Sequence, residues 1–112
     1  MILIIREQAT PEQLEQMAET YVGLMIKLAV DVNRGILSGG GELHADCEQV
    51  LLENGSQQEN VWGADWYPEV KRVGFESLIN IRPRQQNRSM EIKDPDLKEK
   101  IEMIVRNLLE LK

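Results

Sequence analysis

Cysteine and histidine are almost absent from this sequence of 112 residues. Cys47 is the only cysteine and His44 the only histidine. A single cysteine cannot form an intrachain disulfide, which is typical of proteins from a reducing compartment. A zinc site usually needs several cysteine or histidine ligands. We therefore expect a cytoplasmic protein with no metal site and no other cofactor.

Long hydrophobic runs are also missing. The apolar stretch Met1–Ile5 ends at Arg6. It is too short for the core of a signal peptide, and crossing a bilayer takes about 20 apolar residues. We expect no membrane contact. The hydrophobic fraction of 42% and the charged fraction of 29% fit one soluble domain spanning residues 1–112.

Positive charge is missing from the middle of the chain. Between Arg34 and Lys71 there is no lysine or arginine, while seven carboxylates occur there. Residues 71–90 then carry five basic residues and one acid, Glu76. The net charge of −6 disfavours nucleic acid, because binding to nucleic acid depends on phosphate contacts from lysine and arginine. The acidic and basic segments are expected to face each other.

Capping signals and apolar spacing predict three helices. The first starts at residues 10–13, Thr-Pro-Glu-Gln, which combine a capping box with a proline at the first helical position, and Gly23 is expected to end it. The second covers about residues 43–54 and the third starts at Asp94-Pro95. A further capping box at residues 56–59 predicts a single turn.

Alternating or short apolar segments predict the strands. They cover residues 2–5, 25–33, 36–38, 61–67 and 74–82, with a possible short strand at 90–92. The segment 25–33 is expected to be half-buried, and Gly35 suits the hairpin turn that follows it. The resulting order β-α-β-β-α-β-β-α indicates an α+β fold, with a mixed or antiparallel sheet covered by three helices.

The segment Gly39–Asp46 is the first candidate site. Its three glycines lead into a helix start, where backbone N–H groups and the helix dipole favour an anion. The alternative is that the glycines only shape the turn from hairpin to helix. Glu42 and Asp46 share a helix face that His44 does not, which argues against a metal site. Cys47 could form an activated thiolate with His44, but its apolar helix stripe favours the core.

The second candidate site is the polar segment Asn80–Ser89. Arg82 and Arg88 suit a carboxylate or phosphate, and the neutral side chains there add hydrogen-bond donors. These neutral residues are Asn80, Asn87 and Ser89. The alternative is a structural salt bridge from Arg82 or Arg88 to Glu42 or Asp46.

Trp62 and Trp66 share one face of the strand predicted at residues 61–67. Core packing explains this pattern. If the face is exposed, it favours a homodimer interface instead.

Several segments together carry a resemblance to a known family. They are Gly40-Gly41-Glu42-Leu43-His44-Ala45-Asp46, Leu51-Leu52-Glu53-Asn54-Gly55-Ser56, Ser77-Leu78-Ile79-Asn80-Ile81-Arg82-Pro83 and Asn87-Arg88-Ser89. Over nearly the whole chain, the sequence resembles a small uncharacterised prokaryotic family, a domain of unknown function common in cyanobacteria. The resemblance implies a bacterial cytosolic setting and no particular activity.

Three functions follow as hypotheses. The first is a domain that binds a small anionic ligand, or an acidic group of a partner, where the two candidate segments meet. Its binding residues would be Gly40, Gly41, Glu42, Asp46, Asn80, Arg82, Asn87, Arg88 and Ser89. The second is a hydrolase-like enzyme with His44 as general acid/base, oriented by Glu42 or Asp46. The third is an oligomerisation or regulatory module that uses the Trp62/Trp66 face.

Overall fold

The structure, a computed structural model, describes residues 1–111. Its elements are β1 (Leu3–Ile5), α1 (Pro11–Ala18), β2 (Ile26–Asp31), β3 (Ile36–Gly39), α2 (His44–Glu53), β4 (Val61–Tyr67), β5 (Arg72–Gly74) and α3 (Pro95–Leu109). Short 3-10 turns occur at Glu19–Tyr21, Gln58–Asn60, Leu78–Asn80 and Pro83–Gln85. The element order and the α+β class are as predicted. None of the helices within residues 1–111 is long and apolar enough to cross a membrane.

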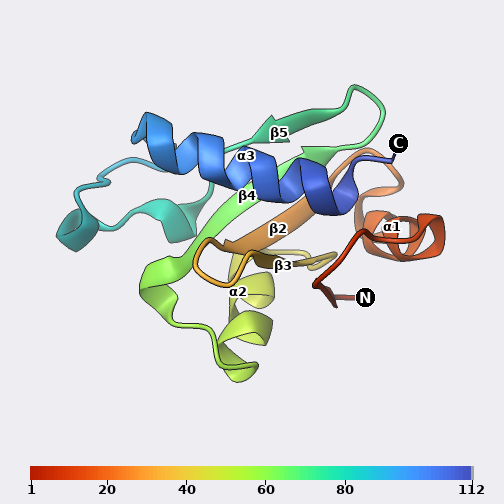
Figure 1. Cartoon of the computed structure of the whole chain (residues 1–112), viewed down its shortest axis with the longest axis horizontal. Coiled ribbons are helices and arrows are strands. Elements are labelled where there is room, and N and C mark those ends of the chain that lie inside the picture. Colours follow the sequence, from red (N-terminus) through yellow and green to blue (C-terminus); the bar gives the residue numbers. More distant parts are fainter. Residues whose placement is uncertain (112) are drawn as a thin grey trace.

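The five strands form one antiparallel sheet in the order β1-β3-β2-β4-β5. In Figure 1, α3 lies across one face of the sheet, and α1 lies beside one end near both chain termini. The helix α2 covers the opposite face, where Cys47 and Leu51 pack against Ala29 of β2. The sheet is therefore the middle layer of three.

The central strand β2 is buried on both faces, so its prediction as a half-buried strand is wrong. Leu28 and Val30 belong to the core cluster under α3, whereas Ala29 belongs to the smaller cluster under α2. Lys27 is the only residue of β2 that is not fully buried. Because helices cover both faces of the sheet, neither face of β2 is exposed to solvent, although its sequence alternates between apolar and polar residues.

The two tryptophans of β4 lie in the core under α3. Trp62 is 4% exposed and Trp66 is 2% exposed. Core packing is therefore confirmed for both residues, and the exposed face that a Trp62/Trp66 dimer interface requires does not exist.

The local capping signals are mostly confirmed. Thr10 and Gln13 form the predicted capping box of α1, with hydrogen bonds of 3.1 and 3.0 Å. Asp94 caps α3. The capping box predicted at residues 56–59 is wrong, because the Ser56 hydroxyl instead accepts a hydrogen bond from the Arg34 guanidinium.

The strand predicted at residues 74–82 is also wrong. The strand β5 ends at Gly74, and Ser77 then caps a 3-10 turn. Between them the chain pairs briefly with residues 90–92, through Ser77 N–H to Met90 O and Ile92 N–H to Phe75 O. The turn places Asn80 against Gly63 of β4 and Arg82 beside Glu48 of α2.

Candidate functional site

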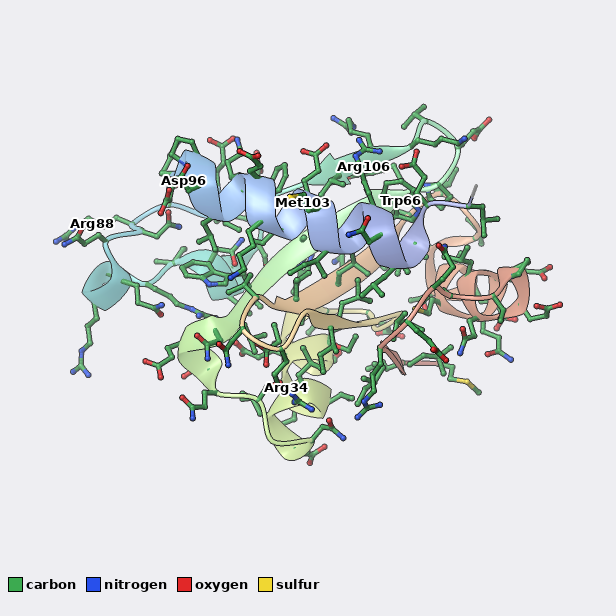
Figure 2. All side chains as sticks on the ribbon, in the orientation of Figure 1. Arg34, Trp66, Arg88, Asp96, Met103 and Arg106 are labelled. Carbon is green, nitrogen blue, oxygen red and sulfur yellow. The ribbon has the colours of Figure 1, made fainter. Side chains whose placement is uncertain are left out.

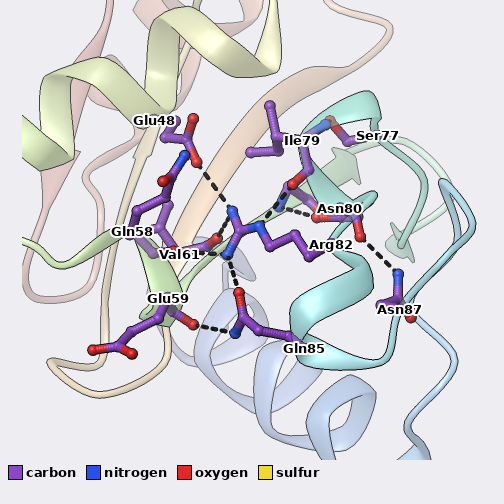
Figure 3. A network of polar contacts seen from close by, with 11 residues as sticks. Glu48, Gln58, Glu59, Val61, Ser77, Ile79, Asn80, Arg82, Gln85 and Asn87 are labelled. Carbon is purple, nitrogen blue, oxygen red and sulfur yellow. Dashed lines mark hydrogen bonds and ion pairs between the residues drawn. The ribbon is translucent and has the colours of Figure 1, made fainter.

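The guanidinium of Arg82 is fully occupied by the protein itself. Its Nε donates to the Ile79 carbonyl at 2.9 Å, and one Nη donates to the Gln58 carbonyl at 2.7 Å and to Gln85. The other Nη donates to the Val61 carbonyl and to the Glu48 carboxylate (Figure 3). The plane also lies over the Trp62 ring, 4.6 Å from its centre. All five N–H groups of an arginine are thereby used, and none remains for a ligand.

Arg82 forms an ion pair, but not with the predicted partner. Its Nη lies 3.0 Å from Oε2 of Glu48, and the two side chains are only 10% and 11% exposed. The predicted pairing with Glu42 or Asp46 is therefore wrong. Burial raises the pKa of Glu48 above its usual value and lowers the pKa of Arg82, in each case against the opposing effect of its partner. The pair fastens the loop to α2 at a cost in desolvation.

The side chain of Asn80 hydrogen-bonds to the backbone of β4 at Gly63, beyond the residues of β4 that pair with β5. Its Oδ1 accepts from Gly63 N–H at 2.8 Å, and its Nδ2 donates to Gly63 O at 3.0 Å. The side chain thus takes the place of a paired residue at the sheet edge beyond β5. A Cβ on Gly63 would lie 2.5 Å from that of Ser77, so only glycine allows this approach.

Asn87 and Ser89 hold the loop that follows Arg82. The Asn87 amide donates to the carbonyls of Asn80, Ser89 and Glu91. The Ser89 hydroxyl accepts from Glu91 N–H at 2.9 Å. Both side chains therefore form their hydrogen bonds within the loop itself.

Arg88 is the exception in this segment. It is exposed and forms no ion pair within residues 1–111. Figure 2 shows it pointing away from the body of the protein at the far end of the loop. It does not converge with Arg82.

The glycines before α2 shape the backbone. Gly40 has a φ of +105°, and a Cβ there would lie 2.2 Å from the Met1 carbonyl oxygen. A Cβ on Gly41 would approach the Cys47 sulfur to 3.1 Å. Glu42 and Asp46 are exposed. Among residues 1–111, neither Glu42 nor Asp46 forms an ion pair with Arg82 or Arg88.

His44 is held by a residue that the sequence did not indicate. Its Nε2 lies 2.7 Å from Oδ1 of Asp65 on β4 and 3.2 Å from the Ala64 carbonyl oxygen. Both neighbours accept hydrogen bonds, so Nε2 carries the hydrogen in the neutral imidazole. Nδ1 then has a lone pair, and among residues 1–111 it has no hydrogen-bond partner. The expectation that Glu42 or Asp46 orients His44 is wrong.

A cavity of about 280 Å³ opens beside His44, between the start of α2 and the turn at residues 77–79. Its lining residues are Lys27, Leu43, His44, Ala45, Glu76, Ser77, Leu78, Ile79 and Met90. The first candidate segment lines this cavity through Leu43, His44 and Ala45, whereas no residue of the segment Asn80–Ser89 is among its lining residues.

Lys27 gives this cavity its positive charge. It forms no ion pair within residues 1–111, and its Nζ lies 5.1 Å from the centre of the Tyr21 ring. Lys27 and Asp65 are directly opposite in the pairing of β2 with β4 and so project from the same face. Lys27 and the anchored imidazole of His44 therefore line one cavity.

Cys47 has no nucleophilic role in this arrangement. It is fully buried on the side of α2 that faces the sheet, and its thiol lies 3.4 Å from the Lys27 carbonyl oxygen. Burial raises the pKa of the Cys47 thiol to about 11. The thiol therefore stays protonated at neutral pH, and the core assignment is confirmed.

Lys27 and Asp65 are the site residues that the sequence analysis missed. Each lies between apolar residues in a predicted strand. A charged residue at such a position could have been taken as a candidate site residue. Their meeting with His44 depends on strand register. Within residues 1–111 no three His, Cys, Asp or Glu side chains form a group that could hold a metal ion.

Residues 3–108 match the family described as "Protein of unknown function (DUF5674)". No similar curated protein and no similar solved structure was found.

Proposed function

Because the chain belongs to the DUF5674 family, which carries no known activity, we propose from the geometry that it binds a small anionic group in the cavity beside His44. The observation that carries the proposal is the convergence of Lys27 and His44 on one cavity, with His44 anchored by Asp65. Lys27 supplies a positive charge that no acidic side chain of residues 1–111 pairs with. The imidazole, once protonated, supplies a second positive charge and an N–H donor at Nδ1.

Other features of the cavity support a ligand rather than a structural ion pair. Leu43 and Leu78 line it and are 58% and 71% exposed. Apolar walls around a few polar groups are typical of small-molecule sites. The volume of about 280 Å³ is near the lower end of ordinary ligand pockets and suits a small anionic group. An acidic side chain of a partner protein could present such a group as well.

The test is a thermal-shift screen with phosphate, sulfate and small carboxylates at constant ionic strength. A ligand at about 100 times its dissociation constant should add about 2.7 kcal/mol to the free energy of unfolding. For a chain of this length that is a rise of about 10 °C in Tm. The shift should vanish in Lys27→Gln and persist in Arg88→Gln, its matched control. A shift that survives Lys27→Gln, or that Arg88→Gln abolishes, would place the site elsewhere.

The His44–Asp65 contact favours a second function, general acid/base catalysis of a hydrolytic reaction. An imidazole whose Nε2 is held by a carboxylate keeps Nδ1 available to take a proton from water or from a substrate hydroxyl. General acid/base groups typically contribute a factor of about 10² to 10⁴ in rate. Hydrolysis of activated esters should then fall by that factor in His44→Gln. Equal rates in His44→Gln and the wild type would exclude this function.

We also propose a bacterial cytoplasmic setting. The lone, buried Cys47 supports a reducing compartment. Fractionation of native cells that places the protein with cytoplasmic markers would agree with this setting. A periplasmic or secreted fraction would contradict it.

A further inference from the structure

Apolar side chains make up most of the wall of the cavity beside His44. Two separate segments of the chain supply them, the start of α2 and the turn at residues 78–80, together with one residue of the segment that follows the loop. Five of the nine lining residues are apolar: Leu43, Ala45, Leu78, Ile79 and Met90.

Three of these apolar side chains are not covered by the rest of the protein. Leu43, Leu78 and Met90 are all exposed, although a long apolar side chain gains free energy when it is removed from water. One exposed apolar residue is common on a protein surface, whereas several together at one concave site are typical of a binding site. They therefore indicate a ligand with an apolar part.

The charged side chains of the same cavity suit a single negative charge. Lys27 is the only lysine or arginine of the lining, and Glu76 repels a second negative charge, because it forms no ion pair within residues 1–111. Phosphate and sulfate are normally bound by several charge-assisted hydrogen bonds. Taking a dianion out of water between apolar walls is costly without such partners. A carboxylate carries one charge and is less costly to place there.

We infer that the ligand is a monocarboxylate with a short aliphatic chain. Its carboxylate lies at Lys27 and His44, and its chain packs against the three exposed apolar side chains. This inference rests on the proposed function and narrows its ligand from any small anion to this class. The chain then contributes about fourfold in affinity for each methylene group that the cavity buries.

The experiment is a set of NMR titrations of the full chain at pH 7 and constant ionic strength. The probes are acetate, propionate, butyrate and pentanoate, which carry the same charge and differ only in the length of the chain. The affinity should rise about fourfold with each methylene group until the chain fills the cavity. Phosphate and sulfate should bind more weakly than butyrate.

Substitutions separate the contribution of the chain from that of the carboxylate. Leu78→Gln should reduce the dependence on chain length and leave the affinity for acetate unchanged, and the exposure of Leu78 keeps this variant folded. Met103→Gln is the matched control, because Met103 is also exposed but lies on α3, away from this cavity. Lys27→Gln should reduce the affinity for butyrate to that for butanol, which has a similar chain and no charge.

The possible failures are distinguishable. If acetate binds in a Lys27-dependent way and the longer acids bind no better, or if phosphate binds more tightly than butyrate, the monocarboxylate class is refuted and the anion proposal stands. A dependence on chain length that is as steep in Leu78→Gln as in Met103→Gln also refutes the inference. If Lys27→Gln weakens the binding of none of the acids, or if no probe binds, both proposals fail.

Discussion

Replacing Arg82 should destabilise the protein more than replacing any other charged residue of the loop. Arg82→Ala removes five hydrogen bonds and leaves the Glu48 carboxylate buried without its cation. Breaking a buried ion pair by removing one partner costs about 3 to 5 kcal/mol. Since a domain of this size has a total stability of about 5 to 15 kcal/mol, we expect the variant to lose about a third or more of it.

Urea unfolding measures this loss directly. The fluorescence of the buried Trp62 and Trp66 reports the transition. Arg82→Lys should also lose more than 1 kcal/mol, because lysine has three N–H donors on a single nitrogen. Arg88→Ala is the control, with an expected change within about 0.5 kcal/mol.

The double variant Arg82→Ala/Glu48→Gln separates the two contributions to this loss. Part of the stability should return, because the unpaired buried charge of Glu48 is removed together with its partner. A loss of stability below about 1 kcal/mol for Arg82→Ala would refute the structural role of the network. The hypothesis that Arg82 binds a ligand would then stand again.

Three further predictions concern packing, the thiol and a cap. Gly63→Ala should cost about 1 to 3 kcal/mol in urea unfolding, because its Cβ would lie 2.5 Å from that of Ser77, and an unchanged midpoint would contradict the close approach. Cys47 should resist thiol reagents until the chain unfolds. Because folding raises the pKa of this thiol to about 11 from about 9, stability should fall as pH rises from 9 to 11, and Cys47→Ala should show a smaller fall. Thr10→Ala should cost about 1 kcal/mol through the lost capping box, and a loss below a few tenths would refute its role.

The sequence predicts this fold well where the determining contacts are local. The cap at Thr10 bonds three residues ahead, and Asp94 bonds two residues ahead. In each of these caps, both hydrogen-bonding partners lie within a few residues of each other in the sequence. The starts of α1 and α3 could therefore be placed before any tertiary contact was known.

The errors arise where a polar side chain has a distant partner. The alternation of residues 74–82 is that of a strand, yet Asn80 turns its amide to Gly63 on β4 and the backbone forms a 3-10 turn instead. The Arg82–Glu48 pair has the same cause, since its members are 34 residues apart. No local pattern specifies these pairings.

The candidate site divides in the same way. The start of α2 follows from the glycine turn before it, but the turn at residues 77–79 on the other side of the cavity lies outside the predicted segment Asn80–Ser89. The chemistry of the site does not follow from local patterns, because Lys27 and Asp65 join His44 only through the register of β2 against β4. The distribution of charge along the sequence indicated Arg82 and Arg88 as binding residues. Arg82 instead pairs with Glu48, and Arg88 points away from the body of the protein.

The most direct test of the site is the nitrogen-15 NMR spectrum of the His44 side chain. His44 is the only histidine, so its signals need no assignment. The structure predicts that Asp65 holds Nε2, that the neutral tautomer carries its hydrogen there, and that the Nδ1 signal shifts when an anion is added. Hydrogen on Nδ1 in the neutral form, or signals that Asp65→Ala and added anions leave unchanged, would contradict it.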